Sequence, residues 1–430
     1  MSTTVQAPPT SPEAPLAPKT VVRRNWKAPI AFGVLTLGLV ALVLARPHSG
    51  ETTFRVASKT DFFTIPQFSV PALTTAWVAI AICALVTVVS LLQARAAKKL
   101  SLWLVAGFGI VALAGFLTWA GADGTVPLVG LFAGTLTLAI PLIFGAMCGV
   151  VGERVGVVNI AIEGQLLLGA FTGALVGTMT GSVWPGALAA MVAGALVALV
   201  LAWFAITYYV DQIIVGVVLN VLILGLTNFL YTEIMSSDIE TYNRPPAFPR
   251  IPIPLLGDIP LIGPVLFRQP LPVYAMFAMV ALLAWGLYRT KWGLRVRAVG
   301  EHPQAADTVG INVKRTRYLN VVLAGAIAGA GGATYTLMAV TQFGQEMTGG
   351  AGYIALAAVI FGRWDPIRAT LAALLFGFTS SLAGLLSVLG SPVPSQFMLM
   401  LPYVVTIVAV AGLVGKSRGP AAVGTPYIKG

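Results

Sequence analysis

The chain has 430 residues, of which 57% are hydrophobic and only 10% are charged. A soluble domain carries about 25% charged residues, so this composition excludes a water-soluble protein and indicates an integral membrane protein. The net charge of +11 would suggest nucleic-acid binding in a soluble domain, but membrane proteins concentrate Lys and Arg on their cytoplasmic side. We therefore expect membrane lipid around the chain and no nucleic-acid partner.

The first 27 residues are rich in Pro, Ala, Thr and Ser. Such a segment cannot bury a hydrophobic core, and we expect residues 1–27 to form a disordered cytoplasmic tail. The apolar run at 28–45 follows basic residues, as the core of a signal peptide does, but it is longer than such a core. We interpret it as an uncleaved first helix, which opens a set of additional membrane helices over 28–120.

A helix needs about 20 apolar residues to cross the hydrocarbon core of a bilayer. About twelve hydrophobic segments fit this requirement or come close to it, and they predict an all-α fold, a polytopic helical membrane protein. The segment 351–362 is too short to cross as a straight helix and is expected to be a re-entrant or broken piece that is buried in protein. The predicted segments are 28–45, 70–92, 101–120, 126–150, 158–181, 184–209, 212–232, 271–288, 318–341, 351–362, 366–386 and 395–414.

The basic residues orient these segments. Placing the N-terminus in the cytoplasm puts 20 of the 26 Lys and Arg residues on the cytoplasmic side. This bias predicts that both termini are cytoplasmic, together with the loop 289–317 and the tail 415–430. The loop 233–270 is then extracytoplasmic, and its eight prolines indicate a stiff cap near the mouth of any pathway.

The stretch VGERVGVVNIAIEGQLLLGAF, residues 151–171, brings charged side chains into an otherwise apolar sequence. Glu153 and Arg154 are expected in a short cytoplasmic turn between two core helices. Gly152 and Gly156 would allow that turn to be tight. We therefore assign Glu153 and Arg154 a structural role in this turn.

Few polar residues lie within the predicted spans. Asn159 and Glu163 are four residues apart and are expected to share one helix face, whereas Gln165 lies nearly opposite Glu163. Polar side chains at membrane depth face the protein interior or a water-filled path. The candidates for the substrate path are Asn159, Glu163, Gln165, Asn220 and Asn228.

A structural alternative stands beside each of these candidates. A polar side chain in a membrane helix can make an interhelical hydrogen bond that contributes about 1 kcal/mol or less. Glu163 in particular could pair with Arg154 or cap a neighbouring helix.

Glycines recur every four residues on the predicted helix 158–181, at Gly169, Gly173, Gly177 and Gly181. Small residues at this spacing let helix backbones approach closely in lipid. The same spacing occurs at Gly325 and Gly329 and at Gly145 and Gly149. We expect these glycines to serve helix packing.

The predicted cytoplasmic loop 289–317 carries seven basic residues around a helix-capable centre, GEHPQAADTVGI. Pro303 stands near the start of this centre and Gly310 at its end, which is the expected order for a short helix. A loop of this length with a helix of its own is typical of a functional segment and not of a simple connector. The pattern indicates a docking surface for a cytoplasmic partner.

The chain lacks a complete phosphate-binding loop and any metal-site motif. The sequence GLVGKSRG near the C-terminus resembles the end of a phosphate-binding loop, but Val410 stands where that loop needs its first glycine. No HExxH motif is present, and the two cysteines and two histidines have no metal-site spacing. We expect no catalytic residues, no metal site and no cofactor in this chain.

Four stretches together resemble the permease subunits of bacterial ABC importers, in the branch of simple-sugar, nucleoside and branched-chain amino-acid permeases. They are GERVGVVNIAIEGQLLLGAF, DQIIVGVVLNVLILGLTNFL, GLRVRAVGEHPQAADTVGINV and GGAGYIALAAVIFGRWDP. The resemblance covers about 126–414, and the first stretch is most similar to the nucleoside-type permeases.

This resemblance implies a transmembrane permease subunit that forms half of the translocation path of an ATP-driven importer in the bacterial inner membrane. Its implied partners are a cytoplasmic ATP-binding subunit that holds ATP and magnesium, a second and non-identical permease, and an extracytoplasmic substrate-binding protein. The ATPase would dock on a coupling helix at Gly300, Glu301, His302, Pro303, Ala305, Ala306 and Gly310.

The expected substrate is a nucleoside, and a sugar or a branched-chain amino acid is the alternative. A transporter driven by an ion gradient is the alternative from another class. It would need an ionisable or oxygen-rich ion site near the middle of the membrane, and Glu163 is the only acidic residue within a predicted span.

Overall fold

The computed structural model describes residues 26–57, 65–98, 100–389, 400 and 419–429. Ten helices among these residues are long and apolar enough to cross a membrane, which confirms the predicted all-α membrane fold. Eleven of the twelve predicted segments correspond to helices. The segment 395–414 and the predicted disordered tail 1–27 lie almost wholly outside the described residues.

The first three helices form a compact unit, made of residues 26–48 and 73–116. The rings of Phe32 and Phe108 stack with their centroids 4.1 Å apart, beside the buried Cys83. These aromatic contacts bury apolar surface where the three helices meet. The helices are α1 (Lys27–Ala45), α2 (Ala72–Arg95) and α3 (Leu102–Ala120).

The second unit contains two small sheets that the sequence did not predict. β1 pairs antiparallel with β2 and parallel with β3, so that Thr53 lies opposite both Ser69 and Thr125. β4 pairs antiparallel with β5. Each strand has only three to five residues, which is too short for a readable alternation of apolar and polar side chains. The strands are β1 (Glu51–Arg55), β2 (Phe68–Pro71), β3 (Thr125–Pro127), β4 (Arg250–Pro252) and β5 (Arg268–Pro270).

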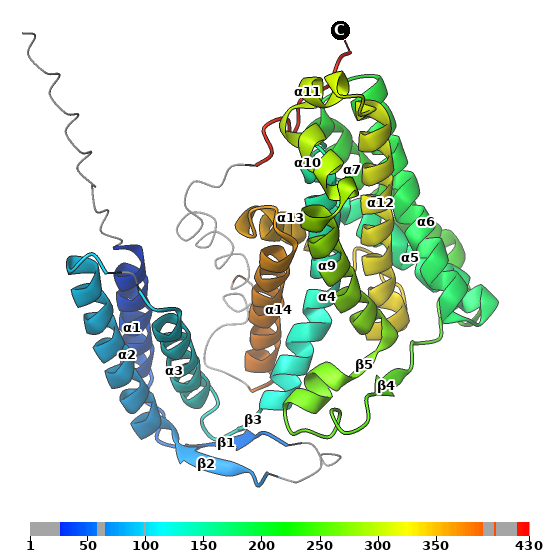
Figure 1. The fold of residues 1–430 in the computed structure, drawn as a ribbon. Coiled ribbons are helices and arrows are strands. Elements are labelled where there is room, and N and C mark those ends of the chain that lie inside the picture. The colour runs from blue at the N-terminus through cyan, green and yellow to red at the C-terminus, as the bar shows by residue number, and fades with distance from the viewer. Residues whose placement is uncertain (1–25, 58–64, 99, 390–399, 401–418, 430) are drawn as a thin grey trace, which may run out of the picture. The chain divides into compact units, whose positions relative to one another are not determined.

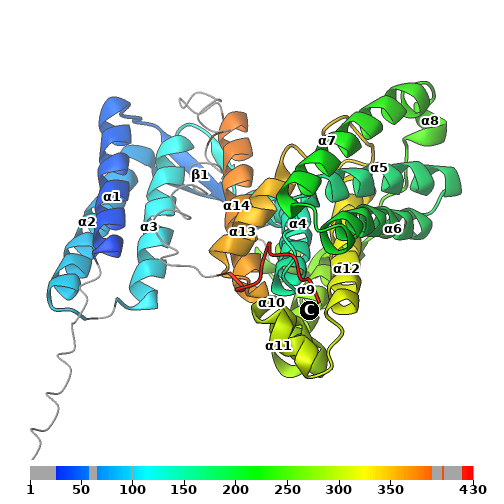
Figure 2. The same ribbon diagram turned by 90° about the horizontal axis from the view of Figure 1, so that it is seen from above.

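In the second unit, α4 packs against α9, α12, α13 and α14. On its other side α12 packs against α5 and α6 (Figures 1 and 2). The helices are α4 (Leu128–Arg154), α5 (Ile162–Thr180), α6 (Val183–Ala202), α7 (Gln212–Leu230), α8 (Ile239–Tyr242), α9 (Leu271–Arg289), α10 (Lys291–Glu301), α11 (Pro303–Thr308), α12 (Val313–Thr334), α13 (Ala351–Phe361) and α14 (Pro366–Val388).

The predicted glycine packing is confirmed where α5, α6 and α12 cross. A Cβ atom on Gly329 of α12 would lie 2.0 Å from the carbonyl oxygen of Ala190 on α6, and one on Gly169 of α5 would lie 2.6 Å from the Gly329 carbonyl. Real Cβ atoms do not come so close, so the backbones touch because these side chains are absent. Gly181, by contrast, ends α5 in a left-handed conformation with φ +63°.

Three core helices end in a short π-helical turn. These turns widen the helix and redirect side chains, and they are frequent at functional sites. The π-helical turns are η1 (Trp203–Thr207) after α6, η2 (Tyr231–Met235) after α7 and η4 (Tyr335–Ala339) after α12, and a further one, η3 (Gly263–Phe267), precedes β5.

Candidate functional site

The turn between α4 and α5 spans residues 155–161, and the predicted position of Glu153 and Arg154 in it was wrong. Both residues belong to the last turn of α4. Gly156 has φ +93° and makes the turn possible, whereas Gly152 lies inside the helix. The reason for the difference is tertiary: α4 continues four residues beyond the apolar run because its last turn is covered by protein, not by lipid or water.

Glu153 and Arg154 both hold Trp364, which lies between α13 and α14. The indole nitrogen of Trp364 donates a hydrogen bond to the Glu153 carboxylate, and Arg154 Nε donates to the Trp364 carbonyl oxygen at 2.9 Å. Arg154 also donates to the hydroxyl of Tyr288 at 3.3 Å. These two charged residues therefore tie the C-terminal end of α4 to the α13–α14 junction.

Asn159 precedes α5, so the predicted shared helix face of Asn159 and Glu163 was wrong. Asn159 instead contacts Gln165: its side-chain nitrogen donates to Gln165 Oε1 at 3.0 Å and to Cys148 Sγ at 3.2 Å. The Cys148 thiol donates to the same Gln165 oxygen at 3.4 Å. All three side chains are fully buried. Asn159, Gln165 and Cys148 thus satisfy one another's hydrogen-bonding groups within the protein interior.

The polar face of α7 binds the backbone of the α4–α5 turn. Gln212 accepts a hydrogen bond from the Val158 amide at 2.7 Å. Asn220 accepts from the Gly164 amide at 2.8 Å and donates to the Ile160 carbonyl at 2.9 Å. We call this set of contacts the turn clasp. It satisfies backbone groups that would otherwise be left unpaired where the turn and the start of α5 are covered by protein, and such unpaired groups are costly.

Glu163 caps α13, one of the structural alternatives for this residue. Its carboxylate accepts hydrogen bonds from the Thr348 hydroxyl at 2.7 Å, the Gly350 amide at 2.8 Å and the Gly352 amide at 2.6 Å. The first amides of a helix have no partner within the helix, and they favour a negative charge. Glu163 therefore fixes the start of α13 and, with it, the loop 340–350.

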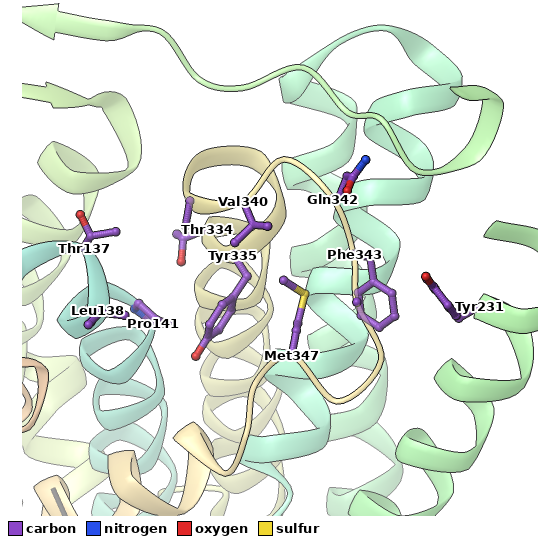
Figure 3. Close-up of a pocket in the computed structure, with 12 residues that line it drawn as sticks. Thr137, Leu138, Pro141, Tyr231, Thr334, Tyr335, Val340, Gln342, Phe343 and Met347 are labelled. Carbon is purple, nitrogen blue, oxygen red and sulfur yellow. The ribbon is translucent and has the colours of Figure 1, made fainter. Parts of the chain in front are cut away.

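The loop 340–350 closes one side of a cavity of about 530 Å³. Asn243 holds the loop by accepting from the Phe343 amide at 2.7 Å and donating to its carbonyl at 2.9 Å. Asn228 donates to Glu346 at 3.4 Å. Figure 3 shows the side chains around the cavity, which come from α4, α7–η2, α12–η4 and this loop. The cavity is lined by Thr137, Leu138, Pro141, Tyr231, Thr334, Tyr335, Ala339, Val340, Gln342, Phe343, Gly344 and Met347.

The lining combines aromatic rings with a few hydrogen-bonding groups. The ring of Tyr231 lies 5.9 Å from that of Phe343, and Tyr335 and Gln342 add polar atoms. A pocket of this size and composition suits a small molecule with a flat apolar part and polar edges. We call it the outer pocket, because the predicted orientation places the loop 340–350 on the extracytoplasmic side.

None of the predicted path residues lines the outer pocket. Asn228 contacts the loop that closes the pocket through Glu346, and Glu163 holds the same loop through Thr348 and Gly350. A usable signal was present in the sequence: VTQFGQEMTGG, residues 340–350, is a polar and glycine-rich break between two apolar runs.

The predicted coupling segment contains the helix α11, which begins at Pro303 and ends at Thr308. Gly310 follows with φ +85°. Pro303 and Ala306 are buried, whereas Glu301, His302 and Ala305 are exposed. Gly300, at the end of α10, packs so closely that an added Cβ would lie 2.1 Å from the Arg154 carbonyl oxygen. α10 is thus packed directly against the last turn of α4, which Glu153 and Arg154 also hold, and α11 follows α10.

The described part of the C-terminal tail, residues 419–429, lies across this junction. The Ala422 amide donates to the Gly300 carbonyl at 2.9 Å and the Gly424 amide to the Gly156 carbonyl at 3.3 Å. Arg317 of α12 is 1% exposed and donates to the Thr425 carbonyl at 3.0 Å.

Two ionisable groups tie the end of the tail to α11. Lys429 lies 3.7 Å from the Asp307 carboxylate. Burial, together with the neighbouring Asp307, raises the pKa of Tyr427 above its ordinary value. Among the described residues, no group of three or more His, Cys, Asp or Glu side chains is placed to hold a metal ion.

Comparison with known proteins places the chain in a family. Residues 131–410 match the family described as "Branched-chain amino acid transport system / permease component". This match spans more than half of the chain. The chain belongs to this permease family.

Several relatives of the permease have been named. The guanosine ABC transporter permease protein NupQ of Bacillus subtilis is 43% identical over 305 residues, 69% of this chain and 95% of NupQ. The nucleoside ABC transporter permease protein NupC of Lactococcus lactis is 39% identical over 312 residues, 69% of this chain and 96% of NupC. A glucose ABC transporter permease protein of Haloferax volcanii, TsgB13, is 30% identical over 256 residues, 56% of this chain and 66% of TsgB13. No solved structure matches the permease significantly.

The family match covers every feature of the site except the C-terminal tail. The α4–α5 turn, the turn clasp, Glu163, the outer pocket and the α10–α11 segment all lie within residues 131–410 of the permease. The three helices of the first unit lie outside the match.

Proposed function

We propose that the permease carries nucleosides across the bacterial inner membrane as one half of an ATP-driven importer. The observation that supports this most strongly is the 43% identity to a guanosine permease over 95% of that protein's length. The outer pocket is compatible with such a substrate. Aromatic rings stack on the flat face of any nucleobase. Gln342 and Thr334 offer hydrogen-bonding groups to the base or the ribose.

In this proposal the permease binds no nucleotide cofactor and catalyses no reaction itself. ATP and magnesium are held by a cytoplasmic ATP-binding subunit, which docks on the exposed side of α11. A second, non-identical permease completes the path, and an extracytoplasmic binding protein delivers the nucleoside. The packing of α10 between α11 and α4 supports this role, because a displacement of α11 would act through α10 on the helix end that Glu153 and Arg154 tie to Trp364.

The outer pocket would then be the first place where the nucleoside meets the permease. Movement of α11 reaches α4, and α4 contributes Thr137 and Pro141 to the pocket wall. The turn clasp connects the same end of α4 to α7, whose π-helical turn contributes Tyr231. We infer that opening and closing of the pocket follow the relative motion of α4 and α7.

A matched pair of aromatic substitutions on one helix end tests the proposal. Tyr231 lines the outer pocket, whereas Phe229, two residues away, is 62% exposed and does not line it. Stacking on a base contributes about 1–3 kcal/mol, so Tyr231→Leu should raise the KM for guanosine uptake by roughly 5- to 150-fold. Phe229→Leu should leave it unchanged. Equal effects of the two substitutions on the KM would show that the outer pocket does not lie on the translocation path.

A sugar is the second candidate substrate, since the chain is also 30% identical to a glucose permease. Competition separates the candidates. Unlabelled guanosine should block uptake of labelled guanosine through the assembled importer, and glucose or leucine in excess should not. Uptake of glucose that guanosine does not inhibit would reassign the permease to sugars.

A further inference from the structure

A second cavity, of about 610 Å³, lies between α10 and the first half of α12. It shares no residue with the outer pocket or the turn clasp, and it borders the predicted coupling segment at Gly310, just after α11. Its lining has a polar end and an apolar end. The residues that define the two ends are Trp292, Arg295, Asn312, Arg315, Leu319 and Leu323. We call this cavity the α10–α12 groove.

Two guanidinium groups stand at the polar end of the α10–α12 groove without a counter-charge. Arg295 comes from α10 and Arg315 from the first turn of α12, and both are exposed. Within the described part of the chain, neither guanidinium makes a salt bridge or a hydrogen bond. Two unpaired positive charges that line one cavity favour an anionic ligand. Arg in particular matches phosphate, because its planar donors bind two phosphate oxygens at once.

The apolar end lies along one face of a membrane-spanning helix. Arg315, Leu319 and Leu323 follow each other at intervals of four residues and therefore share one face of α12. Leu319 is 60% exposed and Leu323 is 43% exposed. At a rise of about 1.5 Å per residue, Leu323 lies about 12 Å along the helix from Arg315. The cavity thus extends from the predicted cytoplasmic surface into the depth of the hydrocarbon.

Trp292 fixes the wall between the two ends. Its indole nitrogen donates a hydrogen bond to Asn320 of α12 at 3.0 Å, so the ring joins α10 to α12. Trp favours the boundary between headgroups and hydrocarbon, where one edge of its ring is apolar and the other is polar. Its position supports a membrane boundary that passes through the α10–α12 groove.

We propose that the α10–α12 groove binds an anionic phospholipid of the cytoplasmic leaflet, with its phosphate on Arg295 and Arg315 and an acyl chain along Leu319 and Leu323. A soluble anion would use the arginines but not the apolar end. A cytoplasmic protein could cover the arginines but could not reach Leu323 inside the membrane. A bound lipid would join α10, and hence α11 after it, to α12.

Lipid retention measured by native mass spectrometry tests this site. The permease is purified with its partner subunits in detergent and titrated with phosphatidylglycerol or with phosphatidylcholine. The test variant is R295Q/R315Q. The matched control is K291Q/K314Q, which removes the same charge from exposed positions on the same two helices outside the groove.

In the unaltered protein and in the control, we expect one phosphatidylglycerol molecule per permease to stay bound under mild collisional activation. In R295Q/R315Q we expect the occupancy by phosphatidylglycerol to be at least fivefold lower. Phosphatidylcholine should be retained equally and weakly by all three proteins. L319S/L323S, which leaves the arginines in place, should also lose the lipid. Each protein is first checked for burial of Cys148, so that a loss of lipid is not a loss of folding.

Several results would overturn the proposal. Equal phosphatidylglycerol occupancy in R295Q/R315Q and its control would show that the groove holds no lipid. Binding of glycerol 3-phosphate alone with the same occupancy would make the groove a site for a soluble phosphate. Loss of the ATP-binding subunit from R295Q/R315Q with lipid retention unchanged would assign the arginines to that partner. Protection of Leu323→Cys from a lipid-soluble maleimide only when the second permease is present would assign the groove to the permease interface.

Discussion

Replacing Glu163 by glutamine removes the charge that holds the start of α13. The carboxylate accepts three hydrogen bonds of 2.6–2.8 Å from Thr348, Gly350 and Gly352. Hydrogen bonds to a charged group contribute about 1.5–3 kcal/mol each, and a negative charge at a helix N-terminus adds about 0.3–1 kcal/mol. Glutamine keeps one accepting oxygen but turns an NH₂ group toward the remaining donors. Because Glu163 is only half-buried, we expect a loss of about 2–4 kcal/mol and not the full sum.

The thiol of Cys148 reports this loss directly. Cys148 is fully buried on α4, and its neighbours in the helix, Gly145 and Gly149, pack against α13. In a Cys83→Ala background it is the single cysteine of the chain. If α13 detaches more often, a maleimide should label Cys148 roughly 30- to 700-fold faster, which corresponds to the expected 2–4 kcal/mol.

The control for this measurement is Glu233→Gln, which removes an exposed carboxylate from η2 and should leave the labelling rate unchanged. A Glu163→Gln protein whose labelling rate stays within twofold of the parent would refute the capping role. If that protein were also stable but inactive in uptake, the carboxylate would act in transport itself. That result would favour the alternative of a transporter driven by an ion gradient.

Three further predictions follow from the packing and the charged contacts. Gly329→Ala should destabilise the α5–α6–α12 crossing by about 1–3 kcal/mol, measured as faster thiol labelling, because the added methyl group meets backbone. Removal of residues 419–430 takes away the Thr425 carbonyl that accepts a hydrogen bond from the buried Arg317, and should lower the free energy of unfolding by about 1–3 kcal/mol. Arg317→Met in the shortened protein should recover most of that loss, which a double-mutant cycle would detect. The double substitution of Glu153 and Arg154 by Ala should reduce co-purification of the ATP-binding subunit and uptake, and should leave nucleoside affinity of the binding protein unchanged; normal assembly and uptake would contradict this.

The membrane helices could be predicted because burial in lipid imposes a strong and local pattern. Long apolar runs had to be helices, since no other open structure satisfies the backbone in a membrane. The short helix at 351–361 could be predicted from the length of its apolar run. The short helix at 303–308 could be predicted from Pro303 at its start and Gly310 after its end.

The site was less predictable because its contacts join distant parts of the chain. Asn159 and Glu163 are four residues apart, but the helix begins between them, and each finds a different partner. The capping role of Glu163 depends on residues almost 190 positions later, and no local pattern encodes that pairing. Tyr231 and Tyr335 line the outer pocket because two helices end in π-helical turns, which the apolar periodicity does not reveal.

ATP-driven uptake in a defined system tests the central claim most directly. The permease is purified with everything that remains bound in mild detergent, reconstituted in liposomes with the binding protein, and supplied with labelled guanosine. The account predicts an ATP-binding subunit and a second, different permease in the purified assembly, and guanosine uptake that requires ATP and magnesium on the cytoplasmic side. A permease that purifies alone and takes up guanosine with an ion gradient but without ATP would contradict it.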